Sequence, residues 1–214
     1  MNVWDDRAEA YRASAIHREG PDLDLFVECC EPGPGVTVLD VATGGGHAAR
    51  RLREAGCAVV TCDASPGMQP DVICRAEDLP FAEASFDRVV NRIAAHHYDD
   101  VQAAVREMAR VSGSLVVIQD LVYVSDDVEA ADKLRDPSHV RAYTEDEWRG
   151  FVAGAGLELE RVERFDRFAP FPYWLSLTGC EGEDAMRARE LFGDRIDDGE
   201  LRISHILIKA RKAG

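Results

Sequence analysis

The sequence predicts an α/β protein with a doubly wound, mostly parallel sheet. Runs of β-branched and other apolar residues alternate with segments whose apolar residues recur every three or four positions, as strands and helices do when they alternate along a chain. The clearest unit is residues 38–52, where an apolar run is followed by Gly44-Gly45-Gly46 and then by a helical pattern. A strand, a glycine turn and a helix in that order let a ligand lie close to bare backbone.

Size and charge favour one compact domain and disfavour nucleic acid and membranes as partners. The chain has 214 residues, 46% of them hydrophobic, and a formal charge of −15 that would repel nucleic acid and anionic membrane surfaces. No apolar run is long enough to span a membrane, and residues 1–20 are too polar for a signal peptide. The six cysteines show no CxxC spacing, so we expect no metal site. We expect a cytoplasmic monomer or homodimer, with residues 1–214 forming a single domain.

The N-terminal segment 1–30 is expected to form a helical cap. Two helical patterns are separated by Gly20-Pro21, and Asp22 is the expected N-cap of the second helix. A Pro/Gly turn then leads into the strand that ends near Asp40.

The next part of the chain is unusually short. Residues 57–63 are expected to form a strand that ends on Asp63, and residues 72–75 form another. Only eight residues join them, and Pro66, Gly67 and Pro70 forbid a helix there. Because parallel strands normally need a longer crossover, either the connection is a short loop or this edge of the sheet is reduced.

The C-terminal half continues the alternation of strands and helices and is expected to add an antiparallel edge to the sheet. Thr144 and Glu147 form a capping box for a helix. The final pair of strands is expected to add an antiparallel last strand, with an aromatic-rich lid insertion at residues 166–200 between them. The other expected elements are a strand from residue 85 leading to a loop that ends at residue 97, a helix at 101–112, and strands at 114–120, 157–165 and 202–210.

Two carboxylates suggest the kind of ligand. Asp63 ends the strand next to the glycine turn, where it could accept hydrogen bonds from a ribose. The glycines and Ala49 fit a loose dinucleotide pattern, but Asp40 would repel a pyrophosphate and attract an amino group. An amine near Asp40 and a ribose near Asp63 together describe S-adenosylmethionine.

The sequence resembles a known family in six segments: WDDRAEAYRASAIHREGPDL (4–23), VLDVATGGG (38–46), AEDLPF (76–81), SFDRVV (85–90), RIAAHH (92–97) and RDPSHVRAYTEDEW (135–148). The whole set resembles the class I S-adenosylmethionine-dependent methyltransferases, in particular the small-molecule branch of the ubiquinone/menaquinone-biosynthesis type (methyltransferase type 11-like). This likeness covers nearly the whole chain and implies a Rossmann-like fold, S-adenosylmethionine as cofactor and a small-molecule acceptor methylated by in-line SN2 displacement.

The resemblance also implies positions for the site residues. It places the amino-acid and ribose end of the cofactor, its adenine and the closing residues at Tyr11, Asp40, Ala42, Gly44, Gly46, Asp63, Ala64, Met68, Ala76, Glu77 and Asn91. Candidate general bases are His96 and His97, which follow a strand at the mouth of the site, and His17, which the resemblance places over the same cleft. The candidate acceptor-binding residues are His139, Arg141, Tyr143 and Trp174. For the histidines, the alternative is that they only hydrogen-bond to loops and shape the pocket. For Arg141 and Tyr143 it is a structural ion pair, and for Trp174 and the aromatic residues around it, packing against the edge of the sheet.

Three departures from the family pattern leave alternatives open. Ala42 replaces the first glycine of the motif, Arg75 replaces an acidic residue that often binds adenine, and the helix after Asp63 is absent. One alternative is therefore a catalytically eroded protein that keeps the fold as a ligand-binding or assembly module. A remoter one is an NAD(P)-dependent reductase.

Overall fold

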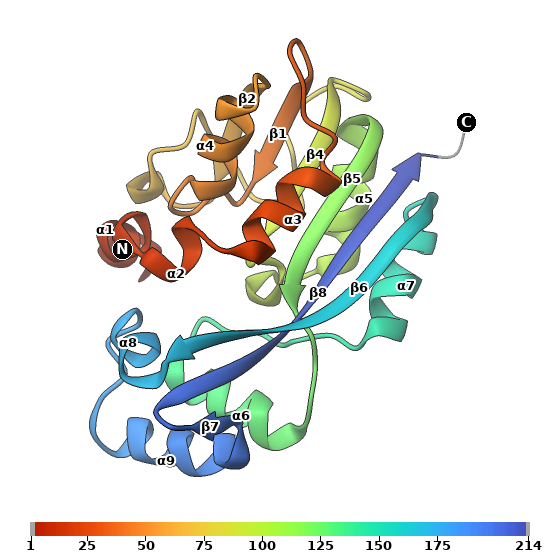
Figure 1. The fold of residues 1–214 in the computed structure, drawn as a ribbon. Coiled ribbons are helices and arrows are strands. Elements are labelled where there is room, and N and C mark those ends of the chain that lie inside the picture. Colours follow the sequence, from red (N-terminus) through yellow and green to blue (C-terminus); the bar gives the residue numbers. More distant parts are fainter. Residues whose placement is uncertain (1–2, 213–214) are drawn as a thin grey trace.

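The structure is a computed structural model that describes residues 3–212, and within this range eight strands form one twisted sheet (Figure 1). The sheet order is β3-β2-β1-β4-β5-β8-β6, with the short β7 paired to β8. The strands are β1 (Thr37–Val41), β2 (Ala58–Asp63), β3 (Val72–Ile73), β4 (Phe86–Arg92), β5 (Ser112–Leu121), β6 (Leu157–Pro170), β7 (Ile196–Asp197) and β8 (Glu200–Lys212).

Strands β1 to β5 pair in parallel, whereas β8 pairs antiparallel with both β5 and β6. The predicted doubly wound sheet with an antiparallel last strand is confirmed. The helices are α1 (Val3–Ala13), α2 (Ala15–Arg18), α3 (Pro21–Cys29), α4 (His47–Glu54), α5 (Val101–Val111), α6 (Asp126–Arg135), α7 (Glu145–Gly154), α8 (Phe171–Ser176) and α9 (Gly182–Phe192), with 3₁₀ turns η1 (Pro66–Met68), η2 (Ala95–His97) and η3 (Gly193–Arg195).

Helices cover both faces of the sheet because its strands are apolar on both sides. Along β1, Leu39 packs into one core with α5 and α7, while its neighbour Val38 packs into the other core with α3 and α4. Val89 and Val90 of β4 divide in the same way. Since successive side chains of a strand point to opposite faces, a continuous apolar run is what a sheet buried on both faces requires.

A third, smaller core lies where β6 and β8 extend beyond the rest of the sheet (Figure 1). Helices α6, α8 and α9 pack there around Phe171, Trp174 and Phe192. Strand β6 continues to Pro170, five residues past the predicted end at residue 165, and Phe168 is 65% exposed on it. Within the predicted lid segment, Phe171 and Trp174 are therefore buried whereas Phe168 is not.

The connection between β2 and β3 is a short loop, and this edge of the sheet is also reduced, so both predicted possibilities occur. Residues 64–71, all of which the structure describes, contain only the 3₁₀ turn η1 and no α-helix. Strand β3 pairs in parallel with β2 but has only two residues, instead of the predicted 72–75. The first N–H of a 3₁₀ turn has no hydrogen-bond partner within the turn. Pro66, the first residue of η1, has no N–H to lose, so a single turn is still possible there.

Two expectations about the N-terminal segment are wrong. Three helices occupy it instead of two, since the chain turns at Ser14 between α1 and α2. Gly20, not Asp22, takes the N-cap position of α3. Asp22 lies inside the helix because its carboxylate pairs with the buried Arg92 at 2.5 Å. By contrast, the capping box of Thr144 and Glu147 on α7 is confirmed.

Candidate active site

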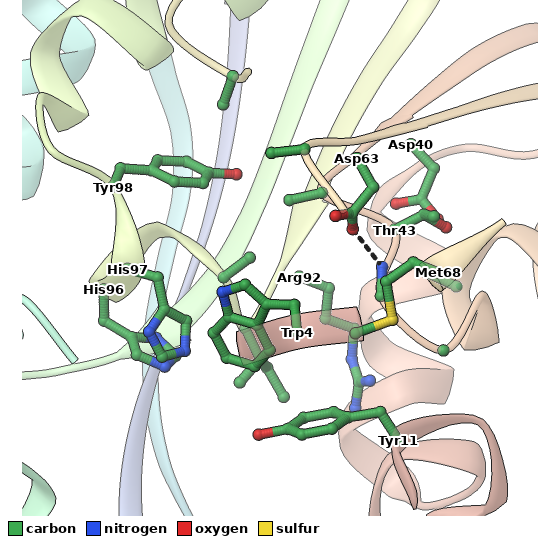
Figure 2. A pocket seen from close by; sticks show the side chains of 18 of the residues that line it. Trp4, Tyr11, Asp40, Thr43, Asp63, Met68, Arg92, His96, His97 and Tyr98 are labelled. Atoms are coloured by element: carbon green, nitrogen blue, oxygen red, sulfur yellow. Dashed lines mark hydrogen bonds between the residues drawn. The ribbon is translucent and has the colours of Figure 1, made fainter. Parts of the chain in front are cut away.

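A cavity of about 340 Å³ lies at the carboxyl ends of β1, β2 and β4 (Figure 2). The order of the sheet reverses at β1, whose neighbours on either side are β2 and β4. In a doubly wound sheet this reversal leaves a crevice beyond the strand ends, because the following segments depart to opposite faces. Helix α1 and the ends of α6 and α8 supply the other walls.

Asp40 stands at the base of the glycine turn and is only 1% exposed. Burial raises its pKa to about 6, and hydrogen bonds from the Thr43 hydroxyl, over 2.7 Å, and from the backbone of Ala49 oppose that shift. The bond from Ala49 means that the carboxylate already uses an amide in the first turn of α4. A pyrophosphate would meet a carboxylate at this helix end instead of free amides. The sequence match to a dinucleotide motif therefore has no counterpart in the geometry.

Asp63 lines the same cavity from the end of β2. One oxygen accepts a hydrogen bond from the backbone amide of Gly44 and the other from that of Ser65, each over 2.9 Å (Figure 2). Burial raises the pKa of Asp63, and these bonds oppose the rise. The two carboxylates predicted from the sequence thus share one cavity, on either side of the glycine turn.

Ala64, Met68, Ala76 and Glu77 line the cavity beyond Asp63. The Arg75 side chain is more than half exposed and bonds to the carboxylates of Glu77, over 3.2 Å, and Asp99, over 2.5 Å. Because two carboxylates neutralise Arg75, the basic residue in this position does not leave an unpaired charge at the site.

The N-terminal helices close one side of the cavity. Tyr11 stacks on His17, with ring centroids 5.5 Å apart. Nδ1 of His17 bonds to the hydroxyl of Ser14 over 2.7 Å. Burial, with the nearby charges of Arg92 and Arg167, holds the pKa of His17 well below its usual value. A neutral, stacked His17 forms part of the wall.

The pKa values of His96 and His97 shift in opposite directions although the two residues are adjacent. Nδ1 of His96 bonds to the buried Asp120. Burial disfavours its charged form, but Asp120 outweighs this and raises the pKa of His96. Burial and the charge on His96 hold the pKa of His97 well below the usual value. Nδ1 of His97 donates to the carbonyl of Ser138 over 3.0 Å, and none of residues 3–212 bonds to its Nε2. His97 is therefore a neutral imidazole with a free lone pair at a cavity wall (Figure 2).

Several predicted site residues lie away from the cavity wall. Asn91 is fully buried, because its amide donates to the carbonyl of Val41 and to the hydroxyl of Tyr98. His139 is held by Glu129 at 3.2 Å, and Arg141 by Glu147 at 2.7 Å. The ring of Tyr143 packs in the core beside α7. The cavity-lining residues do not include these four or Gly46, but they do include Trp174, Ala42 and Gly44.

Other cavity residues were not predicted from the sequence. Trp4 lies edge-on to His97 with ring centroids 4.6 Å apart, and the Arg92 side chain lines the wall. Arg135, at the end of α6, lines it too and stacks 3.5 Å above the Trp174 ring. Trp4, Arg92 and Arg135 all lie in segments that carry the family resemblance, but the resemblance assigned none of their side chains to the site.

The polar groups around the glycine turn fit S-adenosylmethionine. A buried carboxylate at Asp40 suits an ammonium group, and a second at Asp63 suits vicinal hydroxyls. Gly44 has φ of +52°, and a Cβ there would project into open space with no atom within 4 Å. Bare backbone at that point leaves room for a ligand beside both carboxylates.

Comparisons with known proteins agree with this geometry. A family profile described as a methyltransferase domain matches residues 39–117. The chain is 30% identical over 200 residues to an uncharacterized methyltransferase, YcgJ of Bacillus subtilis (strain 168), covering 82% of this chain and 78% of that one. It is also 40% identical over 98 residues to the demethylmenaquinone methyltransferase of Mycolicibacterium paratuberculosis, covering 41% and 43% of the two chains.

Solved structures show the same fold. The crystal structure of YcgJ from Bacillus subtilis superposes with a TM-score of 0.82 at 24% identity, covering 90% of this chain and 98% of that one. A candidate methyltransferase, BH2331 of Bacillus halodurans C-125, gives a TM-score of 0.79 at 28% identity and covers 91% of this chain and all of its own, 100%. With a relative that matches most of both chains, this chain belongs to the class I S-adenosylmethionine-dependent methyltransferases, of the methyltransferase type 11-like branch.

Proposed function

We propose that this methyltransferase acts on a small-molecule acceptor, which binds beside the cofactor in the cavity at the carboxyl edge of the sheet. One observation carries the proposal: a single cavity joins the two carboxylates of the glycine turn to the neutral imidazole of His97. The rings of Trp4, Tyr11 and Trp174 line the same cavity. A concave site of this size, with apolar walls and a few polar groups, suits a small molecule.

At the cofactor end, the proposed roles follow the chemistry of each side chain. Asp40 pairs with the amino group and Asp63 accepts hydrogen bonds from the ribose. Ala64 and Met68 pack against the adenine, with Ala76 and Glu77 at its edge. Ala42, Gly44 and Tyr11 bound the amino-acid portion. The cofactor, when bound, supplies an electrophilic methyl group that the acceptor atom takes by in-line SN2 displacement.

At the acceptor end, His97 is the proposed general base. Its free Nε2 accepts the proton of an acidic O–H, N–H or C–H group as the acceptor atom becomes nucleophilic. The Ser138 carbonyl fixes the tautomer by holding the proton on Nδ1. Asp120 favours the cationic form of His96, whose charge in turn favours the neutral form of His97, and the stacked His17 orients Tyr11.

Two segments are proposed to enclose the acceptor. Residues 1–30 form a cap, since Trp4, Tyr11 and His17 line the cavity from it. Residues 166–200 form a lid, since Trp174 reaches the same cavity from α8. The remaining named residues, His139, Arg141 and Tyr143, support the loop behind His96, because the backbone amides of residues 140 and 141 bond to the carbonyl of His96.

The proposal is tested by locating the transferred methyl group. The protein is incubated with S-adenosylmethionine that carries a tritiated methyl group and with extracts separated into small molecules, protein and nucleic acid. We expect label in the small-molecule fraction only, and none with Asp63→Ala. Label in protein or nucleic acid alone would overturn the acceptor class. A chiral methyl group that emerges without inversion would overturn the in-line displacement.

The oligomeric state and the cellular location of the protein remain predictions. Light scattering would test whether the chain is a monomer or a homodimer, and fractionation of the source cells would test the cytoplasmic location. Among residues 3–212, none of the helices combines the length and the apolar character needed to cross a membrane.

A further inference from the structure

Arg135 is a buried cation on the cavity wall to which the proposed chemistry assigns no role. It is the last residue of α6 and is 5% exposed. Its guanidinium lies flat over the ring of Trp174, at 3.5 Å from the centroid, and Nε donates to the Trp174 carbonyl over 3.3 Å. Its charge also acts on Tyr11 and His17, so it lies at the aromatic end of the cavity.

The guanidinium hydrogen-bonds to the Tyr11 side chain, but one nitrogen at its outer edge has no partner among residues 3–212. Nη2 is buried without a hydrogen bond, and no carboxylate in the described range forms an ion pair with Arg135. The adjacent Asp136 is engaged elsewhere, because its carboxylate bonds to Arg7 over 2.8 Å and to Ser138. Arg135 is thus fixed in plane by the stack while the N–H groups of Nη2 remain unbonded, although its charge also acts on Asp132 and Asp136.

The packing accounts for the charge but not for the unbonded groups. A cation in the last turn of a helix is favoured by the helix dipole, and stacking on tryptophan adds a cation–π contact. Neither interaction satisfies the N–H donors, and a buried charged donor without a partner is costly. An anionic ligand in the cavity would remove that cost.

We propose that the methyl acceptor is a small carboxylic acid whose carboxylate binds the outer edge of Arg135. The proposal rests on the proposed function, since it names the acceptor of the same cavity. A guanidinium held flat offers parallel N–H groups that match the two oxygens of a carboxylate. The rings of Trp4, Tyr11 and Trp174 accommodate an apolar body attached to that carboxylate.

The charge of the whole chain makes such a local cation necessary. A net charge of −15, with Asp40 and Asp63 in the same cavity, repels an anion. Arg135 lies among aromatic side chains rather than beside these two aspartates, so it favours one orientation of the acceptor. The carboxylate is held at the aromatic end, and the rest of the acceptor extends towards the cofactor end.

The test uses benzoate as the probe and benzamide as its neutral isostere. Calorimetry measures the binding of each to the full chain saturated with S-adenosylhomocysteine, in wild type, Arg135→Gln and Arg135→Lys. We expect benzoate to bind wild type about tenfold more tightly than benzamide, as one lost charge-assisted hydrogen bond corresponds to about that factor. The preference should vanish in Arg135→Gln and persist in reduced form in Arg135→Lys.

The control variant is Arg187→Gln on α9, whose side chain is exposed and pairs with Glu190. It removes the same charge and should keep the preference for benzoate. Failure to bind benzoate, or an equal preference in wild type and Arg135→Gln, would overturn the proposal.

Binding of S-adenosylhomocysteine distinguishes a failure of this proposal from a failure of the proposed function. If it binds all variants while benzoate shows no dependence on Arg135, only the acceptor class is wrong. If it fails to bind wild type, the proposed function is wrong.

Discussion

Nε2 of His47 donates a hydrogen bond of 2.9 Å to the backbone carbonyl of Tyr11, and this bond attaches the N-terminal helix to the glycine turn. His47 is the first residue of α4, and Tyr11 lies 36 positions earlier on α1. Gly45 lies directly beneath the contact, where a Cβ would stand 2.7 Å from the carbonyl oxygen of Tyr11. Close approach of two backbone segments therefore closes this side of the cavity.

The first prediction concerns that approach. Gly45→Ala should displace α1 from the glycine turn, because backbone atoms cannot yield as a flexible side chain can. We expect at least about a tenfold loss in affinity for S-adenosylhomocysteine and a lower Tm. Gly150→Ala is the control, since it lies in α7 with nothing within 4 Å of the added atom. That change should stabilise the protein by up to about 1 kcal/mol and leave binding unchanged. Unchanged binding by Gly45→Ala would contradict the close approach.

The second prediction concerns the charge of Asp40. Burial raises its pKa to about 6, so the folded chain holds this proton more tightly than the unfolded chain does. The free energy of unfolding therefore falls as the pH rises from about 4 to about 6. We expect Asp40→Asn to increase the free energy of unfolding at about pH 7.5 by up to about 3 kcal/mol, and to have little effect at about pH 4. Urea unfolding at the two pH values measures this.

Protonation of Asp40 should weaken cofactor binding, although it stabilises the folded protein. Wild-type affinity for S-adenosylhomocysteine should fall as the pH drops below about 6, because protonation removes the partner of the ammonium group. Asp40→Asn should bind weakly at every pH. Glu54→Gln, an exposed change at the end of α4, should alter neither the free energy of unfolding nor the affinity for S-adenosylhomocysteine appreciably. A variant at Asp40 that binds as wild type does would remove this residue from the site.

The third prediction separates two histidines. His97→Gln should reduce kcat by about a hundredfold or more if Nε2 removes a proton, while affinity for S-adenosylhomocysteine stays the same. His139→Gln is the matched control, because His139 bonds to Glu129 away from the cavity wall. Since its pKa is well below the usual value, His97 should remain neutral into the acidic range. Equal activity of His97→Gln and wild type would assign the residue to wall packing alone.

The fourth prediction concerns the buried ion cluster behind the cavity. Asp22 pairs with Arg92 at 2.5 Å and with Arg167 at 3.2 Å, and all three are largely buried. Asp22→Ala would leave two buried cations without their carboxylate and should cost about 3 to 5 kcal/mol in the free energy of unfolding. Asp24→Ala, two residues along α3, breaks only the exposed pair with Arg51 and should cost under about 1 kcal/mol. Comparable losses in the two variants, measured by urea unfolding, would contradict the importance of the cluster.

Much of the fold was predictable because it depends on local patterns. The apolar run before the glycines and the spacing of Val101, Val105 and Met108 predict elements that the structure confirms. The capping box on α7 is equally local, since its two residues lie three positions apart. Asp22 shows the limit of such reasoning. It has the composition of an N-cap, but a partner 70 positions away determines its role.

By itself, the sequence determined the sheet type, the glycine turn and the two carboxylates, because periodicity and turn chemistry act over a few residues. Only the tertiary structure decided which side chains share the cavity. Trp4, Arg92 and Arg135 reach its wall from separate elements, while the predicted His139 and Arg141 are held elsewhere by glutamates. Likewise, the pKa values of His96 and His97 shift in opposite directions because Asp120, on β5, pairs with His96, whereas burial and the charge on His96 lower the pKa of His97.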